Sequence, residues 1–143
     1  MVIDLDGRIF RATENSQSGD VGEGTLFHYH QDGTTVWANY NGGAIVRGHL
    51  IATLGPDGTL DMRYHHLNTS ADLMTGTCTS RIEALADGSY RLHEDWQWTC
   101  GEKKRGNSVL EQVEPERLSL LHEFGDVDSG AMDASPSDLQ AAV

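Results

Sequence analysis

The sequence has few basic residues for its length. Its 143 residues include 10 Lys and Arg against 22 Asp and Glu, which gives a formal net charge of −12. Proteins that bind the phosphate backbone of nucleic acids or an anionic membrane surface need clustered positive charge. We therefore expect neither nucleic acid nor membrane as a partner. No apolar run approaches the roughly 20 residues that a helix needs to cross a bilayer.

Cysteine is also scarce. Cys78 and Cys100 are the two cysteines, which are too few for a metal knuckle. The segment from Met1 to Asp6 contains two acids and no basic stretch followed by a long apolar one, so no secretory signal peptide is expected. We therefore expect a cytoplasmic protein whose two cysteines remain thiols, because reducing compartments do not sustain structural disulfides.

Proline is rare, with three residues, whereas glycine is abundant, with 16. Together with a hydrophobic share of 38%, this composition is typical of a turn-rich β protein and not of a helical bundle or a disordered chain.

Negative charge is concentrated towards the carboxyl-terminal end. Residues 111–143 contain eight acids and one base, which accounts for −7 of the total charge. Residues 125–143 have few large apolar side chains, so we predict an acidic flexible tail there, since burial cannot offset the entropy lost on ordering. Residues 114–124 predict a short amphipathic helix, because Pro115 suits a first helical position and apolar residues follow at near-helical spacing. One domain is expected over residues 1–113.

An Asp-Gly pair recurs four times, at Asp6-Gly7, Asp32-Gly33, Asp57-Gly58 and Asp87-Gly88. The last three pairs lie between segments of alternating polarity, where a three-residue loop with Gly at positive φ would form a hairpin. These turns and the other breaks delimit eight expected strands near 8–13, 24–30, 34–40, 44–54, 59–67, 72–85, 89–100 and 107–113.

Short loops between consecutive strands make neighbours antiparallel. We therefore predict an all-β fold, an eight-stranded antiparallel up-and-down meander that closes into a β-barrel. Because alternate turns of a meander lie at opposite ends, the Asp-Gly turns share one end. The other end is a looser mouth formed by residues 14–23, 41–43, 68–71 and 101–106, the last of which contains the basic cluster Lys103-Lys104-Arg105.

The two later hairpins separate polar from apolar residues when they are paired about their Asp-Gly turns. About Pro56-Asp57-Gly58 the inward pairs are Leu54–Leu60, Ala52–Met62, Leu50–Tyr64 and Gly48–His66. About Ala86-Asp87-Gly88 they are Ala84–Tyr90, Ile82–Leu92, Ser80–Glu94, Cys78–Trp96, Gly76–Trp98 and Met74–Cys100.

The first hairpin allows two orientations. A two-residue Asn41-Gly42 turn places Trp37 and Asn39 inside, and with them Phe27 and Tyr29. We favour this orientation, because large aromatic side chains gain most from burial. A three-residue Asn41-Gly42-Gly43 loop instead places a different set inside, namely Leu26, His28, His30, Val36, Ala38 and Tyr40.

Glu94 is the most informative inward residue, because a carboxylate inside a barrel must be paired, hydrogen-bonded or protonated. It could anchor a cationic or hydroxyl group of a ligand or act as a general base. Alternatively, interior neighbours satisfy it and it has a structural role. The expected ligand contacts are Tyr64, His66, Ser80, Glu94, Trp96 and Trp98.

Seven histidines raise the question of a metal site. His28-x-His30 places two imidazoles on one strand face, and with Gly22 it matches the opening of the cupin metal motif. Thr34 and Thr35 stand where that motif needs Glu, and a metal site needs three or four converging ligands. We therefore expect no metal. Phosphate-loop, dinucleotide and hydrolase-elbow templates are also missing, so no cofactor is expected.

Five segments carry a family resemblance: 25–30 (TLFHYH), 40–51 (YNGGAIVRGHLI), 60–66 (LDMRYHH), 73–76 (LMTG) and 92–99 (LHEDWQWT). They resemble short bacterial proteins commonly labelled N-acetylglutamate synthase, over about residues 7–113. An acetyltransferase of the usual kind needs a mixed α/β chain and a glycine-rich loop that opens a helix and holds the coenzyme A pyrophosphate. The sequence shows neither.

The predicted meander also resembles, by architecture, the calycin group, the barrels of lipocalins, fatty-acid-binding proteins and avidin. This resemblance implies a barrel that holds a largely apolar or aromatic small molecule in its interior. We expect the molecule to enter past the basic mouth loop. Two alternatives stay open: a barrel enzyme using Glu94 and His66 in isomerase-like acid/base chemistry, and a protein-interaction module with no interior ligand. A solidly packed interior, without a cavity of about 300 Å³, would count against both the interior binder and the enzyme and would favour the last of these.

Overall fold

The computed structural model describes residues 2–16 and 19–113. Eight β-strands follow one another along these residues: β1 (Ile9–Asn15), β2 (Leu26–Asp32), β3 (Thr35–Gly42), β4 (Ile45–Leu54), β5 (Thr59–Asn68), β6 (Leu73–Ala84), β7 (Tyr90–Trp98) and β8 (Arg105–Gln112). The helix predicted over 114–124 and the tail predicted over 125–143 lie outside the described residues.

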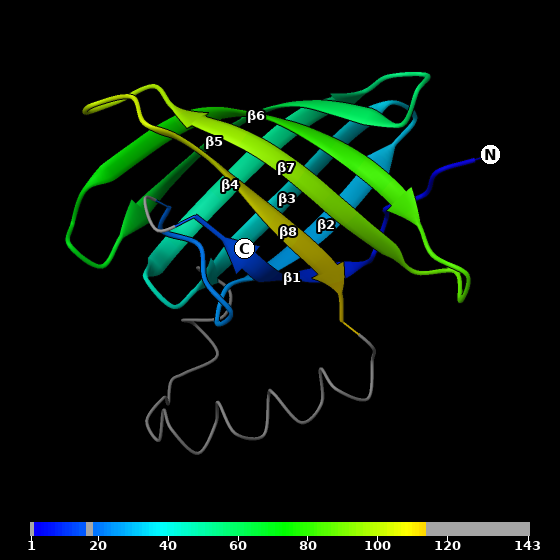
Figure 1. Ribbon diagram of the computed structural model, residues 1–143, viewed down its shortest axis with the longest axis horizontal. Helices are drawn as coiled ribbons and strands as arrows, with labels where there is room; N and C mark the ends of the chain where they lie inside the picture. The colour runs from blue at the N-terminus through cyan, green and yellow to red at the C-terminus, as the bar shows by residue number, and fades with distance from the viewer. Residues whose placement is uncertain (1, 17–18, 114–143) are drawn as a thin grey trace, which may run out of the picture. The chain divides into compact units, whose positions relative to one another are not determined.

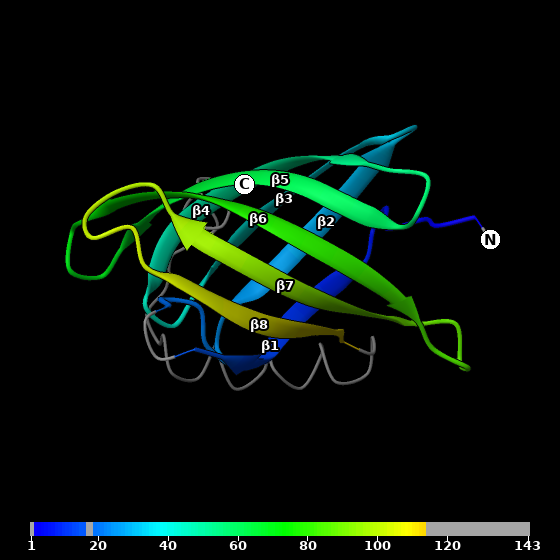
Figure 2. The same cartoon turned by 45° about the horizontal axis from the view of Figure 1, so that its top comes forward.

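Each strand pairs antiparallel with the next, and β1 pairs with β8 to close the sheet into a barrel (Figures 1 and 2). The predicted all-β meander and its closure are confirmed. No helix in the described part of the chain is long and apolar enough to cross a membrane.

The two ends of the barrel differ, as the alternation of turns predicted. In Figure 1 the β2–β3, β4–β5 and β6–β7 turns lie at the end near the N-terminus. Leu5 seals this end: it is fully buried in the core, and its backbone N–H donates to Gln31 Oε1 at 2.8 Å. The β1–β2, β3–β4, β5–β6 and β7–β8 loops form the opposite end, the mouth.

The predicted registers of the two later hairpins are confirmed. Strand β4 pairs with β5 from Leu54↔Leu60 to Gly48↔His66, and β6 pairs with β7 from Ala84↔Tyr90 to Gly76↔Trp98. Inward positions therefore alternate along each strand as expected. Cys78 and Cys100 are both free.

The first hairpin corrects the expected orientation. Its loop is the two residues 33–34, with Gly33 at φ +63°, and Asp32 pairs with Thr35. The shorter loop reverses which face of β3 meets the inward face of β2, because side chains alternate with a period of two. Phe27 therefore pairs with Tyr40 inside, as Tyr29 does with Ala38.

Each sequence-based alternative was thus right for one strand and wrong for the other. Phe27 and Tyr29 are buried as favoured, but the buried residues of β3 are Val36, Ala38 and Tyr40. Trp37 lies on the outer face, where its ring stacks on that of His30 with centroids 5.6 Å apart.

Candidate functional site

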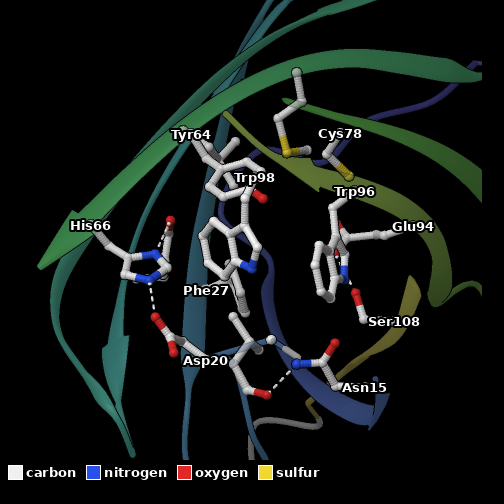
Figure 3. Close-up of a pocket in the computed structure, with 15 residues that line it drawn as sticks. Asn15, Asp20, Phe27, Tyr64, His66, Cys78, Glu94, Trp96, Trp98 and Ser108 are labelled. Atoms are coloured by element: carbon white, nitrogen blue, oxygen red, sulfur yellow. Dashed lines mark hydrogen bonds and ion pairs between the residues drawn. The ribbon is translucent and has the colours of Figure 1, made fainter. Parts of the chain in front are cut away.

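A cavity of about 40 Å³ lies inside the barrel near the mouth (Figure 3). This volume holds roughly three water molecules. Loop residues Gly19, Asp20 and Val21 form one side, and inward side chains of the barrel form the rest. The barrel residues lining it are Asn15, Phe27, Tyr40, Leu50, Met62, Tyr64, His66, Cys78, Glu94, Trp96, Trp98 and Ser108.

The structure brings together five of the six predicted contacts: Tyr64, His66, Glu94, Trp96 and Trp98 all line the cavity. Ser80 does not line it. Ser80 is fully buried opposite Glu94 on the neighbouring strand, and its Oγ has no hydrogen-bond partner within the described residues.

Aromatic rings form the wall of the cavity. The centroid of Trp98 lies 5.6 Å from that of Trp96, 5.7 Å from that of Tyr64 and 5.6 Å from that of His66. Figure 3 shows Trp98 between His66 and Trp96. Such a wall offers flat apolar surfaces to a ring-containing ligand.

Two glycines on neighbouring strands make room for these rings. Gly76 pairs with Tyr64, and a Cβ atom added there would lie 2.2 Å from the Tyr64 hydroxyl. Gly106 pairs with Trp96, and an added Cβ would lie 2.4 Å from its ring. The rings thus lie over the adjacent strand at points where no side chain competes.

Glu94 is buried on β7, and Ser108 of β8 donates to its Oε1 at 3.0 Å. Burial raises the pKa of Glu94 to about 7, although the Ser108 hydrogen bond opposes the rise. Its charge in turn contributes to raising the pKa of Tyr29, whose hydroxyl is buried without a hydrogen-bond partner among the described residues. The interior thus contains polar groups that can still form hydrogen bonds.

His66 lies at the other side of the cavity in a chain of hydrogen bonds. Its Nε2 is 2.9 Å from Asp20 Oδ2, and its Nδ1 is 3.0 Å from Tyr40 Oη. Asn68 Nδ2 donates to the same Asp20 oxygen at 3.2 Å. Burial lowers the pKa of His66 below its ordinary 6.5, against the opposing effect of Asp20, so the ring is neutral at pH 7.

Sequence reasoning missed Asp20 and Asn15 as parts of the site. Asp20 belongs to the β1–β2 loop, where no alternation of polarity indicates direction, and its partners lie 46 and 48 residues away in the sequence. Asn15 ends β1, and its Nδ2 donates to the Val21 carbonyl oxygen, which ties the loop to the strand.

Glu94 and His66 have separate partners. Glu94 accepts from Ser108, whereas His66 bonds to Asp20 and Tyr40. The basic cluster lies at the mouth, where Lys104 pairs with Glu102 at 3.3 Å between exposed side chains, and Lys103, Lys104 and Arg105 do not line the cavity.

Within the described residues, no three His, Cys, Asp or Glu side chains converge to hold a metal ion. His49 and His65 form the predicted cross-strand pair, with ring centroids 6.0 Å apart. His28 and His30 lie at positions that alternate with the buried Phe27 and Tyr29.

A larger hollow of about 620 Å³ lies against the outer faces of β5 to β8. It is lined by Asp61, Arg63, Thr77, Cys78, Thr79, Asp95, Trp96, Gln97, Arg105, Gly106 and Asn107. Arg63 and Asp61 pair there at 2.7 Å, with both side chains more than 60% exposed. We place the candidate site in the inner cavity, because buried polar groups with shifted pKa values are concentrated there.

The comparisons with known proteins agree with this architecture. One protein-family model, described as avidin-like protein, matches residues 3–113, a range that includes all eight strands. No curated protein and no solved structure matches the chain.

Proposed function

The chain belongs to the avidin-like family, and from that premise we propose that its barrel binds one small organic molecule with an aromatic or apolar body at the inner cavity. Eight-stranded barrels can hold one small ligand in this way, as streptavidin does. The observation that carries the proposal is a wall of Tyr64, Trp96 and Trp98 next to the buried carboxyl group of Glu94.

Each part of this wall suits a different part of a ligand. The rings of Trp96 and Trp98 offer stacking surfaces. The Glu94 carboxyl group, which accepts a hydrogen bond from Ser108, can also accept from or donate to a polar group of a ligand. A site with an apolar wall and a few placed polar groups is the usual form of a small-molecule pocket.

The size of the cavity restricts how binding occurs. About 40 Å³ is far below the ~300 Å³ of a pocket for a drug-sized molecule, so in this conformation the interior meets the condition stated above for a protein-interaction module. Interior binding therefore requires the cavity to enlarge. The barrel strands are fixed by pairing on both sides, whereas Gly19, Asp20 and Val21 lie outside any strand. We infer that binding displaces this loop segment from the mouth, and that the ligand enters there.

Tryptophan fluorescence tests the proposal directly. We expect biotin, which streptavidin binds, phenylacetate or phenylacetamide to change the emission of the full-length protein saturably, with one site per chain. Trp98→Phe reduces the change, whereas Trp37→Phe, which alters an outer-face ring, preserves it. Glu94→Gln weakens binding about tenfold through the loss of one hydrogen bond.

Native mass spectrometry of protein purified from its own host provides the second test. We expect a co-purifying small molecule that is lost from Glu94→Gln. A bare protein that also gives no saturable signal with any of the three probes would overturn the proposal. Turnover of a bound compound that Glu94→Gln abolishes would instead identify an enzyme.

A further inference from the structure

We propose that Asp20 occupies a carboxylate-binding subsite of the cavity, so that the ligand of this protein carries a carboxylate that replaces Asp20. This inference rests on the proposed function and names the chemical class of its ligand. His66 Nε2 and Asn68 Nδ2 form the subsite, and both bond to the same oxygen of Asp20 (Figure 3 shows the bond to His66).

Both protein groups act as donors. A carboxylate oxygen accepts hydrogen bonds, so the proton of the neutral His66 ring is on Nε2, facing Asp20. The bare Nδ1 then accepts from the Tyr40 hydroxyl at 3.0 Å, which holds the ring in this tautomer and orientation. Two donors on one strand, two residues apart, therefore converge on an acceptor oxygen.

The donors belong to the barrel, but the acceptor does not. His66 and Asn68 are buried residues of β5, whereas the Asp20 side chain is 23% exposed and comes from the β1–β2 loop. A ligand carboxylate at this position would form the same two hydrogen bonds and bring the same charge. The exchange leaves neither buried donor unpaired, which avoids the cost of a buried donor without a partner.

The position of the subsite matches the aromatic wall. The His66 ring lies 5.6 Å from Trp98 and 6.4 Å from Tyr64, measured between centroids. A molecule whose ring rests on Trp98 therefore lies beside the ring of His66, one of the two donors. This placement favours small aromatic or heterocyclic carboxylic acids over their neutral analogues.

The experiment compares phenylacetate with phenylacetamide, which have the same ring but differ in charge. We expect Asp20→Ala to raise the affinity for phenylacetate at least tenfold and that for phenylacetamide less than threefold, because the competing carboxylate is gone. Glu23→Ala is the matched control, since it removes the same charge from an exposed position of the same loop. It should change neither affinity.

A second variant tests the donors. Asn68 Oδ1 accepts from the backbone N–H groups of Ser70 and Asp72, and Asn68→Asp keeps these acceptors while it removes the Nδ2 donor. Added to Asp20→Ala, it should abolish the gain for phenylacetate. Acetate should also raise the Tm of Asp20→Ala more than acetamide does, and this readout needs no aromatic group.

An equal rise for acid and amide in Asp20→Ala, or the same rise in Glu23→Ala, would overturn the carboxylate subsite while the binding function stands. Binding of a host molecule that carries no carboxylate would do the same. Absence of every bound molecule would instead remove the proposed function itself.

Discussion

Glu94 shows how a single buried position can couple the interior to pH. Its carboxyl group is buried on β7 and has a pKa of about 7, against an ordinary 4.5, with burial as the main cause. The folded protein therefore holds a proton on Glu94 between pH 4.5 and 7, where the unfolded chain has lost it. The stability contributed by this proton is fully present below pH 4.5 and is lost as the pH rises through 7.

We expect Glu94→Gln to remove this dependence, because Gln is neutral at every pH and retains the acceptor for Ser108. Relative to this variant, the wild type should lose roughly 3 kcal/mol of unfolding free energy between pH 4.5 and 7.5. Urea denaturation of both proteins across this range measures the difference. A difference that stays constant with pH would show that the buried carboxyl does not hold its proton in this way.

Among individual residues, alternation along the strands predicted which side chains point into the barrel interior. Tyr64, His66, Glu94, Trp96 and Trp98 lie on strands, and the parity of each strand places them inside. Asp20 could not be predicted, because the direction of a loop side chain depends on its distant partners.

Among the strands, close packing of an aromatic ring over a glycine of the neighbouring strand recurs. Gly48, Gly76 and Gly106 pair with Tyr40, Tyr64 and Trp96 respectively. In each pair an added Cβ would lie within 2.4 Å of the ring or its hydroxyl. The ring packs on a flat backbone surface. The glycine, which weakens a strand on its own, is compensated because the ring covers its exposed backbone.

Gly76→Ala should therefore destabilise the protein by about 1–3 kcal/mol, because the new methyl group meets both Tyr64 and the Gln97 carbonyl oxygen and something must move. Thermal and urea unfolding measure the loss, and near-UV circular dichroism should report the displaced ring. Gly22→Ala is the control: no atom lies within 4 Å of its added Cβ, and a change within 0.5 kcal/mol is expected. Equal effects at both positions would contradict this account.

Turn length decided which hairpins could be predicted. The three-residue Asp-Gly model gave correct registers for β4–β5 and β6–β7, but at Asp32-Gly33 the aspartate is still paired in β2 and the loop is the two residues 33–34. All three loops contain Gly at positive φ, so composition does not distinguish the two-residue loop from the three-residue ones. The burial of Val36 on β3 follows from this one-residue difference.

The barrel as a whole is closed around its circumference and at one end. Pairing of β1 with β8 leaves no free edge among the described strands. Leu5 fills the end opposite the mouth, and the Gln31 side chain fixes the segment by accepting from Leu5 N and donating to Ile3 O. The eight strands and their closure were predictable from hairpin spacing, whereas this seal was not, because residues 2–8 carry no strand pattern.

Leu5→Ala should destabilise the fold by about 2–5 kcal/mol, since a fully buried side chain leaves a cavity behind. Chemical denaturation gives the loss, with Val2→Ala as the control, because Val2 is 89% exposed. Ligand affinity at the mouth should not change in either variant. A loss below about 1 kcal/mol would show that Leu5 does not seal this end.

The seal at Leu5 also has a kinetic consequence. In a barrel with one open end, a ligand enters and leaves through the same mouth, so a bound ligand must leave before another can bind. A free ligand cannot displace the bound one by entering from the opposite end, because that end is closed. If the barrel binds a ligand as proposed, the residence time of that ligand is set by the opening of the mouth, and an excess of competitor does not shorten it.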